Sequence, residues 1–129
     1  MICSNIFTSA CNLIAESIGG TLASADLAAR APYIIASFCG MASTADKHYR
    51  RGFSLGEQPA FDRSHIDLTE RFPLCDRFIP SAAAYLAAML IAPENPELSA
   101  ILRESARNEL TAAYDEIPSV IHGIIDNYK

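Results

Sequence analysis

The chain has 129 residues, half of them hydrophobic and 19% charged, a composition that fits one folded domain and argues against wholesale disorder. Ten Lys and Arg face fifteen Asp and Glu, which gives a formal net charge of -5. This balance argues against non-specific nucleic-acid binding, because such binding depends on neutralising phosphates.

No secretory signal is visible in the first residues, and the most apolar run, residues 78–92, is shorter than the roughly 20 residues that a membrane span needs. The four cysteines have no paired spacing of the zinc or redox kind. We therefore expect reduced, unpaired cysteines and a protein that is made in a cytosol.

Two helices are predicted in the first 52 residues. Apolar residues at spacings of three and four predict a first helix, capped by Ser4 or Asn5 and ended by Gly19-Gly20. The second begins near Ser24 or Asp26, and Gly52 stops it. Pro32 lies inside the apolar stripe of the second helix, so we expect a kink there or a helix that begins at it.

Residues 52–73 form the irregular part of the chain, because glycines and prolines interrupt them and no helical period is present. The alternation of apolar and polar residues over 65–69 allows a short strand. A loop of this length is often functional.

A third, alanine-rich helix is predicted over residues 74–91. A fourth follows the cap Asn95, with Pro96 at its first position, and Pro118 breaks the pattern at its end. Residues 118–129 can form one more short helix. The predicted fold class is all-α: a single domain of four to five helices over residues 1–129, with a C-terminal arm from about residue 117.

The arm carries apolar side chains on one side, and we take them as a candidate partner interface: Ile117, Val120, Ile121, Ile124, Ile125 and Tyr128. A short helix is marginal alone and must bury such a side somewhere. Two interpretations of where the arm buries this side stay open. The arm packs on its own core, or it inserts into a groove of a neighbouring subunit or partner.

The only basic cluster is residues 47–51, in which Lys47, Arg50 and Arg51 are possible subunit contacts. The alternative is a solvated helix end, where cations complement the helix dipole. Residues 26–77 have no net charge, whereas residues 78–129 hold three basic and seven acidic residues. This asymmetry allows head-to-tail docking of copies in a ring.

No pattern predicts a catalytic, metal-binding or cofactor-binding residue, and we expect no enzyme. Asp62, Ser64 and His65 group an acid, a hydroxyl and an imidazole, but such residues in a loop usually form turns. The three histidines are far apart, and no phosphate-binding glycine loop is present. An enzyme that uses His65 or Cys39 is the weakest alternative.

Several stretches resemble the head-to-tail connector proteins of tailed phages. They are a Pro-led helix start at residues 72–80, an alanine-rich helix at 82–90, an acidic turn with Glu97-Leu98 at 93–100, and the Leu-Ile-Gly helix end within 12–19. The resemblance implies a helical adaptor without enzymatic activity or cofactors, which forms a ring between portal and tail.

The same resemblance implies partners and a location. The partners are other copies of the chain and portal and tail proteins, without specific nucleic-acid recognition or membrane contact, and the C-terminal arm would face the portal. The location is the cytoplasm of the bacterial host and then the neck of the virion. The alternative function is a small bacterial interaction or regulatory domain without catalytic activity.

Overall fold

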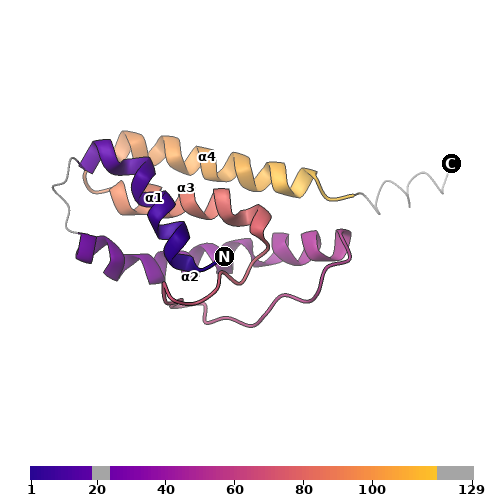
Figure 1. Cartoon of the computed structure of the whole chain (residues 1–129). Helices are drawn as coiled ribbons and strands as arrows, with labels where there is room; N and C mark the ends of the chain where they lie inside the picture. The colour runs from indigo at the N-terminus through magenta and orange to yellow at the C-terminus, as the bar shows by residue number, and fades with distance from the viewer. Residues whose placement is uncertain (19–23, 119–129) are drawn as a thin grey trace.

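The computed structural model describes residues 1–18 and 24–118, which form four α-helices (Figure 1). These are α1 (Cys3–Ile18), α2 (Ser24–Gly52), α3 (Ile79–Ile91) and α4 (Pro96–Asp115), and a 3-10 turn, η1 (Asp76–Phe78), directly precedes α3. The predicted all-α fold class is confirmed. Within the described ranges, no helix is both long enough and apolar enough to cross a bilayer.

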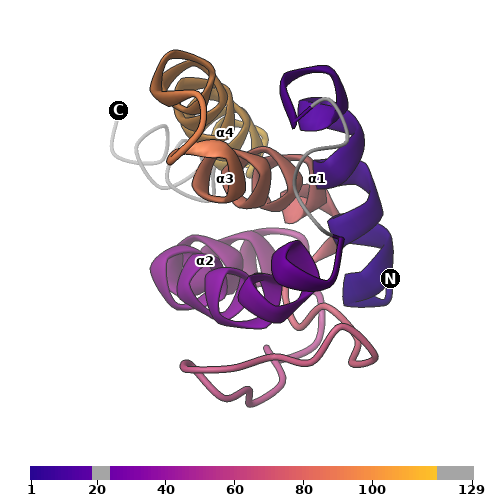
Figure 2. The ribbon, with the colours of Figure 1, turned by 90° about the vertical axis from the view of Figure 1, so that its left-hand side faces the viewer.

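α3 is the central helix, and α1, α2 and α4 lie on different sides of it (Figure 2). Nine of its thirteen residues are buried. Its alanines allow this arrangement, because small side chains let three neighbouring helices approach the same backbone. The larger Leu86, Leu90 and Ile91 fill the spaces between the helices and are at most 1% exposed.

Two buried serines join α3 to α4. Ser81 Oγ donates to the carbonyl of Ala106 at 2.6 Å, and Ser99 Oγ donates to that of Ala88 at 2.8 Å. Burying an unpaired hydroxyl is costly, so these bonds make the small polar residues acceptable in the core. At the start of α4, Asn95 Oδ1 accepts from the Leu98 N–H at 3.1 Å, which confirms the predicted cap.

The start of α1 differs from the prediction because another segment holds the N-terminus. α1 begins at Cys3, so Ser4 and Asn5 lie inside its first turn instead of capping it. The Cys3 N–H donates to the carbonyl of Glu70 at 2.9 Å, and the Phe72 N–H donates to that of Met1 at 2.8 Å. The predicted stop at residues 19–20 lies outside the described residues.

Two further helix starts were predicted near prolines; that of α2 is confirmed and that of α3 is corrected. α2 begins at Ser24 and continues through Pro32, so the alternative in which the helix begins at this proline is wrong. α3 begins at Ile79 and not at residue 74, which places Pro80 in the first turn, where the missing N–H is tolerated. Leu74 is buried because the irregular chain before α3 packs on the core.

Residues 53–75 are here called the linking segment; part of it runs along the side of α2 that faces away from α3 (Figure 2), and its last residues, among them Phe72 and Leu74, pack in the core. The outgoing limb (residues 53–66) reaches Pro32, whose carbonyl accepts from the Ile66 N–H at 3.1 Å. The return limb (residues 67–75) leads back to η1. The short strand that the alternation allowed at residues 65–69 does not form: in the described chain, β pairing is limited to an isolated antiparallel bridge between Ile2 and Arg71.

Candidate functional site

A buried carboxylate on α2 holds both limbs of the linking segment. Asp46 is 0% exposed. Its Oδ2 accepts from Gln58 Nε2 of the outgoing limb and from Arg50 Nε of the next helical turn, each at 2.8 Å. Its Oδ1 accepts from the backbone N–H of Cys75, on the return limb, at 2.7 Å. We call Asp46, Arg50, Gln58 and Cys75 the clasp.

Arg50 extends the clasp to more of the same segment. Its Nη1 donates to the carbonyls of Gly56 and Glu57 at 3.1 and 3.2 Å, and its Nη2 donates to that of Pro73 at 3.1 Å. The side chain is 17% exposed. Arg50 therefore binds within its own chain, whereas Lys47 and Arg51, the other two predicted contacts, are exposed.

The clasp determines the charge state of its carboxylate. Burial alone would raise the pKa of Asp46, but the hydrogen bonds from Cys75, Gln58 and Arg50 outweigh burial and lower this pKa below its usual 3.8. The neighbouring Cys75 thiol responds in the opposite direction: burial, and then the Asp46 carboxylate, raise its pKa to about 11. Asp46 is therefore ionised and Cys75 protonated at neutral pH.

The cysteines are unpaired, as predicted. Cys3 and Cys39 are buried, and burial raises the pKa of Cys3 to about 11 and that of Cys39 further. Because the thiolate is the reactive form of cysteine, these environments disfavour Cys39 as a nucleophile.

The group around residues 62–65 forms a turn, as predicted. Asp62 Oδ1 accepts from the Ser64 N–H at 2.8 Å and from the Ser64 hydroxyl at 2.7 Å. His65 Nε2 lies 3.2 Å from Asp67 Oδ1, and its ring contacts that of Tyr33 with centroids 5.1 Å apart. The carboxylate and the imidazole therefore have separate partners.

The C-terminal ends of α2 and α4 lie at the same end of the molecule (Figure 1). Arg77 of η1 fixes the end of α4, because its Nη2 lies 2.6 Å from Glu116 Oε2 and its Nη1 lies 3.4 Å from Glu109 Oε2. The His48 ring of α2 meets the Tyr114 ring edge-on, with centroids 6.1 Å apart. These contacts set where the chain leaves α4.

Ile117, the first residue of the predicted arm, lies against the end of α2. A Cβ atom at position 52 would overlap Ile117 Cγ2, so Gly52 is needed for this close approach. α2 does end at Gly52, as predicted, but the residue with left-handed backbone geometry is Ser54, with φ of 55°. The bonds from Leu55 N to Arg50 O (2.7 Å) and from Ser54 N to Arg51 O (3.3 Å) are those of a Schellman C-cap.

Exposed apolar side chains gather around this last turn of α2. Phe53, Leu55 and Tyr114 are 40%, 49% and 48% exposed. Leu55 shares a surface hollow with Lys47 and Arg51. We name this region the distal surface; it comprises Lys47, Arg51, Phe53, Leu55, Tyr114 and Ile117.

The structure thus brings together two features that the sequence treats separately, the basic cluster and the root of the arm. The remaining arm residues predicted as an interface lie outside the described residues: Val120, Ile121, Ile124, Ile125 and Tyr128. The clasp itself was missed by the sequence reasoning. Its one signal is an acidic residue at an apolar position of a helix, four residues before Arg50.

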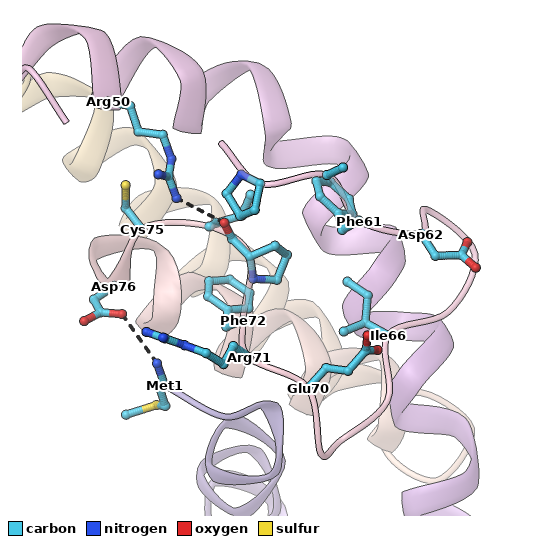
Figure 3. A pocket seen from close by; sticks show the side chains of 14 residues that line it. Met1, Arg50, Phe61, Asp62, Ile66, Glu70, Arg71, Phe72, Cys75 and Asp76 are labelled. Carbon is cyan, nitrogen blue, oxygen red and sulfur yellow. Dashed lines mark hydrogen bonds and ion pairs between the residues drawn. The ribbon is translucent and has the colours of Figure 1, made fainter. Parts of the chain in front are cut away.

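A cleft of about 500 Å³ opens between the two limbs of the linking segment (Figure 3). Figure 3 shows Phe61 and Ile66 on one side of it and Arg71 and Phe72 on the other. Met1 closes one edge, where its ammonium group lies 3.9 Å from Asp76 Oδ1. The cleft combines apolar walls with charged groups at its rim.

Neither a metal-binding group in the described residues nor a match to a known protein identifies what the site does. Across residues 1–18 and 24–118, no group of three or more His, Cys, Asp and Glu side chains is placed to hold a metal ion. No protein family, no curated protein and no solved structure matches the chain.

Proposed function

We propose that this chain is a structural adaptor of a phage or prophage virion, similar to the head-to-tail connectors that form a ring between portal and tail. Its partners are other copies of itself and portal and tail proteins. It acts by presenting surface to these proteins, without bond-making chemistry, specific nucleic-acid recognition or membrane contact.

The distal surface is the observation that supports this proposal most directly. Large exposed apolar side chains that gather in one region mark protein contact sites, especially where polar or charged residues surround them. Phe53, Leu55 and Tyr114 are exposed at this end of the molecule, and Leu55 shares a hollow with Lys47 and Arg51. The arm begins at the same place, so one end of the molecule offers both a fixed surface and a segment that continues from it.

The contacts beneath the distal surface make it rigid before any partner arrives. Tyr49 packs against Phe53 with ring centroids 4.6 Å apart and edge-on against the buried Phe78 at 5.5 Å. Arg77 ties the end of α4 to η1. A preformed surface loses less entropy on binding, which suits a part that must fit between two larger assemblies.

The sequence resemblance supports the same function from a different region. Residues 72–100, which carry most of it, form η1, α3, the Asn95 cap and the start of α4. This is the centre of the bundle, on which α1 and α2 pack. The residues that carry the resemblance therefore lie in the centre of the bundle, whereas the distal surface is the proposed contact with other proteins.

The proposal is tested by mass measurement of the full chain with the purified portal ring of the phage or prophage that encodes it. We expect the portal ring to gain whole multiples of 14.0 kDa. An unchanged portal mass at saturating chain concentration would contradict the proposal. A dimer that ignores the portal ring would favour the alternative, a small bacterial interaction or regulatory domain.

A further inference from the structure

The cleft between the two limbs is held open by the clasp. Gln58 fixes one limb and Cys75 fixes the other, and both bind the same Asp46 carboxylate. Arg50 reaches across to the carbonyl of Pro73, as the dashed line in Figure 3 shows. The cleft therefore exists in the free chain, and a ligand does not have to form it.

One wall of the cleft has backbone groups free for pairing. In the antiparallel bridge between Ile2 and Arg71, the hydrogen bonds come from the flanking residues, so the N–H and C=O of Arg71 point away from residues 1–3. Neither group has a hydrogen-bond partner among residues 1–18 and 24–118. On the facing limb, the N–H groups of Ala60 and Phe61 are also unpaired within these ranges.

Local contacts fix the carboxylates that line the cleft, and the donors to Asp62 and Glu70 are neutral, so both keep their negative charge. Asp62 accepts two hydrogen bonds from Ser64, Glu70 Oε2 accepts from the Asp67 N–H at 2.7 Å, and Asp76 faces the ammonium group of Met1.

The two arginines that line the cleft differ in how many partners their side chains have. Arg50 uses four of its five N–H donors in bonds to Asp46, Gly56, Glu57 and Pro73. Arg71 is exposed and forms no ion pair within the described part of the chain. One guanidinium is therefore left to attract an acidic group.

We propose that this cleft binds an extended peptide segment of a partner protein, which adds as a strand beside Arg71 and sets an acidic side chain against its guanidinium. Unpaired strand backbone is a template for such addition, and side-chain pockets give it specificity. Phe61, Ile66 and Phe72 supply the apolar walls. The volume of about 500 Å³ lies within the usual range for ligand sites. This inference goes beyond the adaptor function and does not depend on it.

The test is selection of a random short-peptide library on the full chain, followed by affinity measurement on the enriched peptides by fluorescence anisotropy. We expect enriched peptides to carry Asp or Glu. Arg71→Glu should weaken their binding about tenfold or more, because a hydrogen-bonded charge pair is lost. Replacing the acidic peptide residue by Lys should restore affinity for Arg71→Glu. Amide shifts of residues 60, 61 and 71 should change in the wild-type complex.

Matched variants separate the cleft from general effects. Arg103→Glu makes the same charge change on an exposed residue of α4 that has no ion pair in the described chain, and should leave binding unchanged. Ala60→Trp should fill the cleft and abolish binding, whereas Ala100→Trp, on exposed α4, should not. Thermal melting verifies that each variant folds.

Two results would overturn the proposal. One is that no selected peptide binds the wild type more tightly than Ala60→Trp. The other is that Arg71→Glu and Arg103→Glu change the affinity for the peptides equally. Binding of the same variants to the portal ring is measured separately, from the mass of the complex. Failure of the peptide site and failure of the adaptor function are therefore distinguishable.

Discussion

Ser54 adopts the left-handed backbone conformation that glycine prefers, with φ of 55°. This conformation costs a residue with a Cβ atom about 1 kcal/mol. Ser54 is exposed and its side chain has no hydrogen-bond partner within residues 1–18 and 24–118, so the side chain does nothing to offset the cost.

We therefore predict that Ser54→Gly raises the free energy of unfolding by about 0.5–1 kcal/mol, as measured by urea denaturation. Ser54→Ala keeps the Cβ atom and should give no gain. Equal stability of the two variants would show that the backbone at this position is not strained.

Gly40 and Gly52 both belong to α2, yet only Gly40 should gain stability from replacement by alanine. A Cβ at Gly40 would have its nearest neighbour, Arg63 Nη1, at 3.7 Å, an ordinary contact, so Gly40→Ala should stabilise the protein by about 0.5–1 kcal/mol. At Gly52 the Cβ would overlap Ile117, and no gain is expected. In the Ile117→Ala background the overlap disappears, and Gly52→Ala should become more favourable. Additive effects of Gly52→Ala and Ile117→Ala would contradict the contact.

At the scale of elements, the clasp is what gives the linking segment a defined course. Its backbone has few partners of its own, so the segment depends on one carboxylate that binds both limbs. Asp46→Asn keeps the shape of the side chain but removes the charge and turns one acceptor into a donor that faces other donors.

The Asp46→Asn variant should lose about 3 kcal/mol of unfolding free energy, because it breaks a buried charge pair. Amides of residues 56–75 should exchange faster with solvent, while those of α3 should keep their relative protection. Asp26→Asn is the control, because Asp26 is exposed and its carboxylate is 4.0 Å from the Arg30 guanidinium, a weak ion pair. This substitution should change the free energy of unfolding by less than about 0.5 kcal/mol. Uniform acceleration of exchange over the whole chain would contradict a local clasp.

The lowered pKa of Asp46 also gives the clasp a pH dependence with a definite sign. A carboxyl group with a lower pKa when folded stabilises the protein fully above its ordinary pKa, here 3.8, and loses that contribution as pH falls through the folded value.

Wild-type unfolding free energy should therefore fall more steeply than that of Asp46→Asn when acid is added between about pH 5 and pH 2. Asp62 and Glu116, whose pKa values are also lowered by their hydrogen-bond partners, titrate in both proteins and cancel in the difference. Parallel curves for the two proteins would show that Asp46 is not the titrating group.

The helices were predictable because each one shows its pattern locally. Asn95 and Pro96 mark the start of α4 without reference to any other segment, and the structure confirms this cap. The linking segment was not predictable in the same way. The alternation at residues 65–69 suggested a strand, but the pairing occurs at Arg71, through a partner some seventy residues earlier in the chain.

The clasp could not be predicted for a similar reason. Asp46 meets its partners Gln58 and Cys75 only after the linking segment has folded back over α2. A single sequence shows that an acidic residue interrupts an apolar stripe, but not which donors will neutralise it. The distal surface likewise depends on how far α2 and α4 extend in the same direction (Figure 1).

On the scale of the whole molecule, the two ends of the bundle differ. One end combines the last turns of α2 and α4 with the root of the arm, and Leu55 is half exposed there. α1 ends at the opposite end (Figure 1), and it carries Leu13 with almost the same exposure, 50% against 49%. These two leucines allow the contact function of the distal surface to be separated from exposed hydrophobicity in general.

Leu55→Asp should weaken binding to the portal ring at least about tenfold, because a charge placed within an apolar contact must be desolvated without a partner. Leu13→Asp makes the same chemical change away from the distal surface and should leave the mass gained by the ring unaltered. Both side chains are about half exposed, so neither variant should change the unfolding free energy by more than about 0.5 kcal/mol. If the two variants bind the ring equally well, the distal surface is not the portal contact, and the adaptor would have to dock through another face of the bundle.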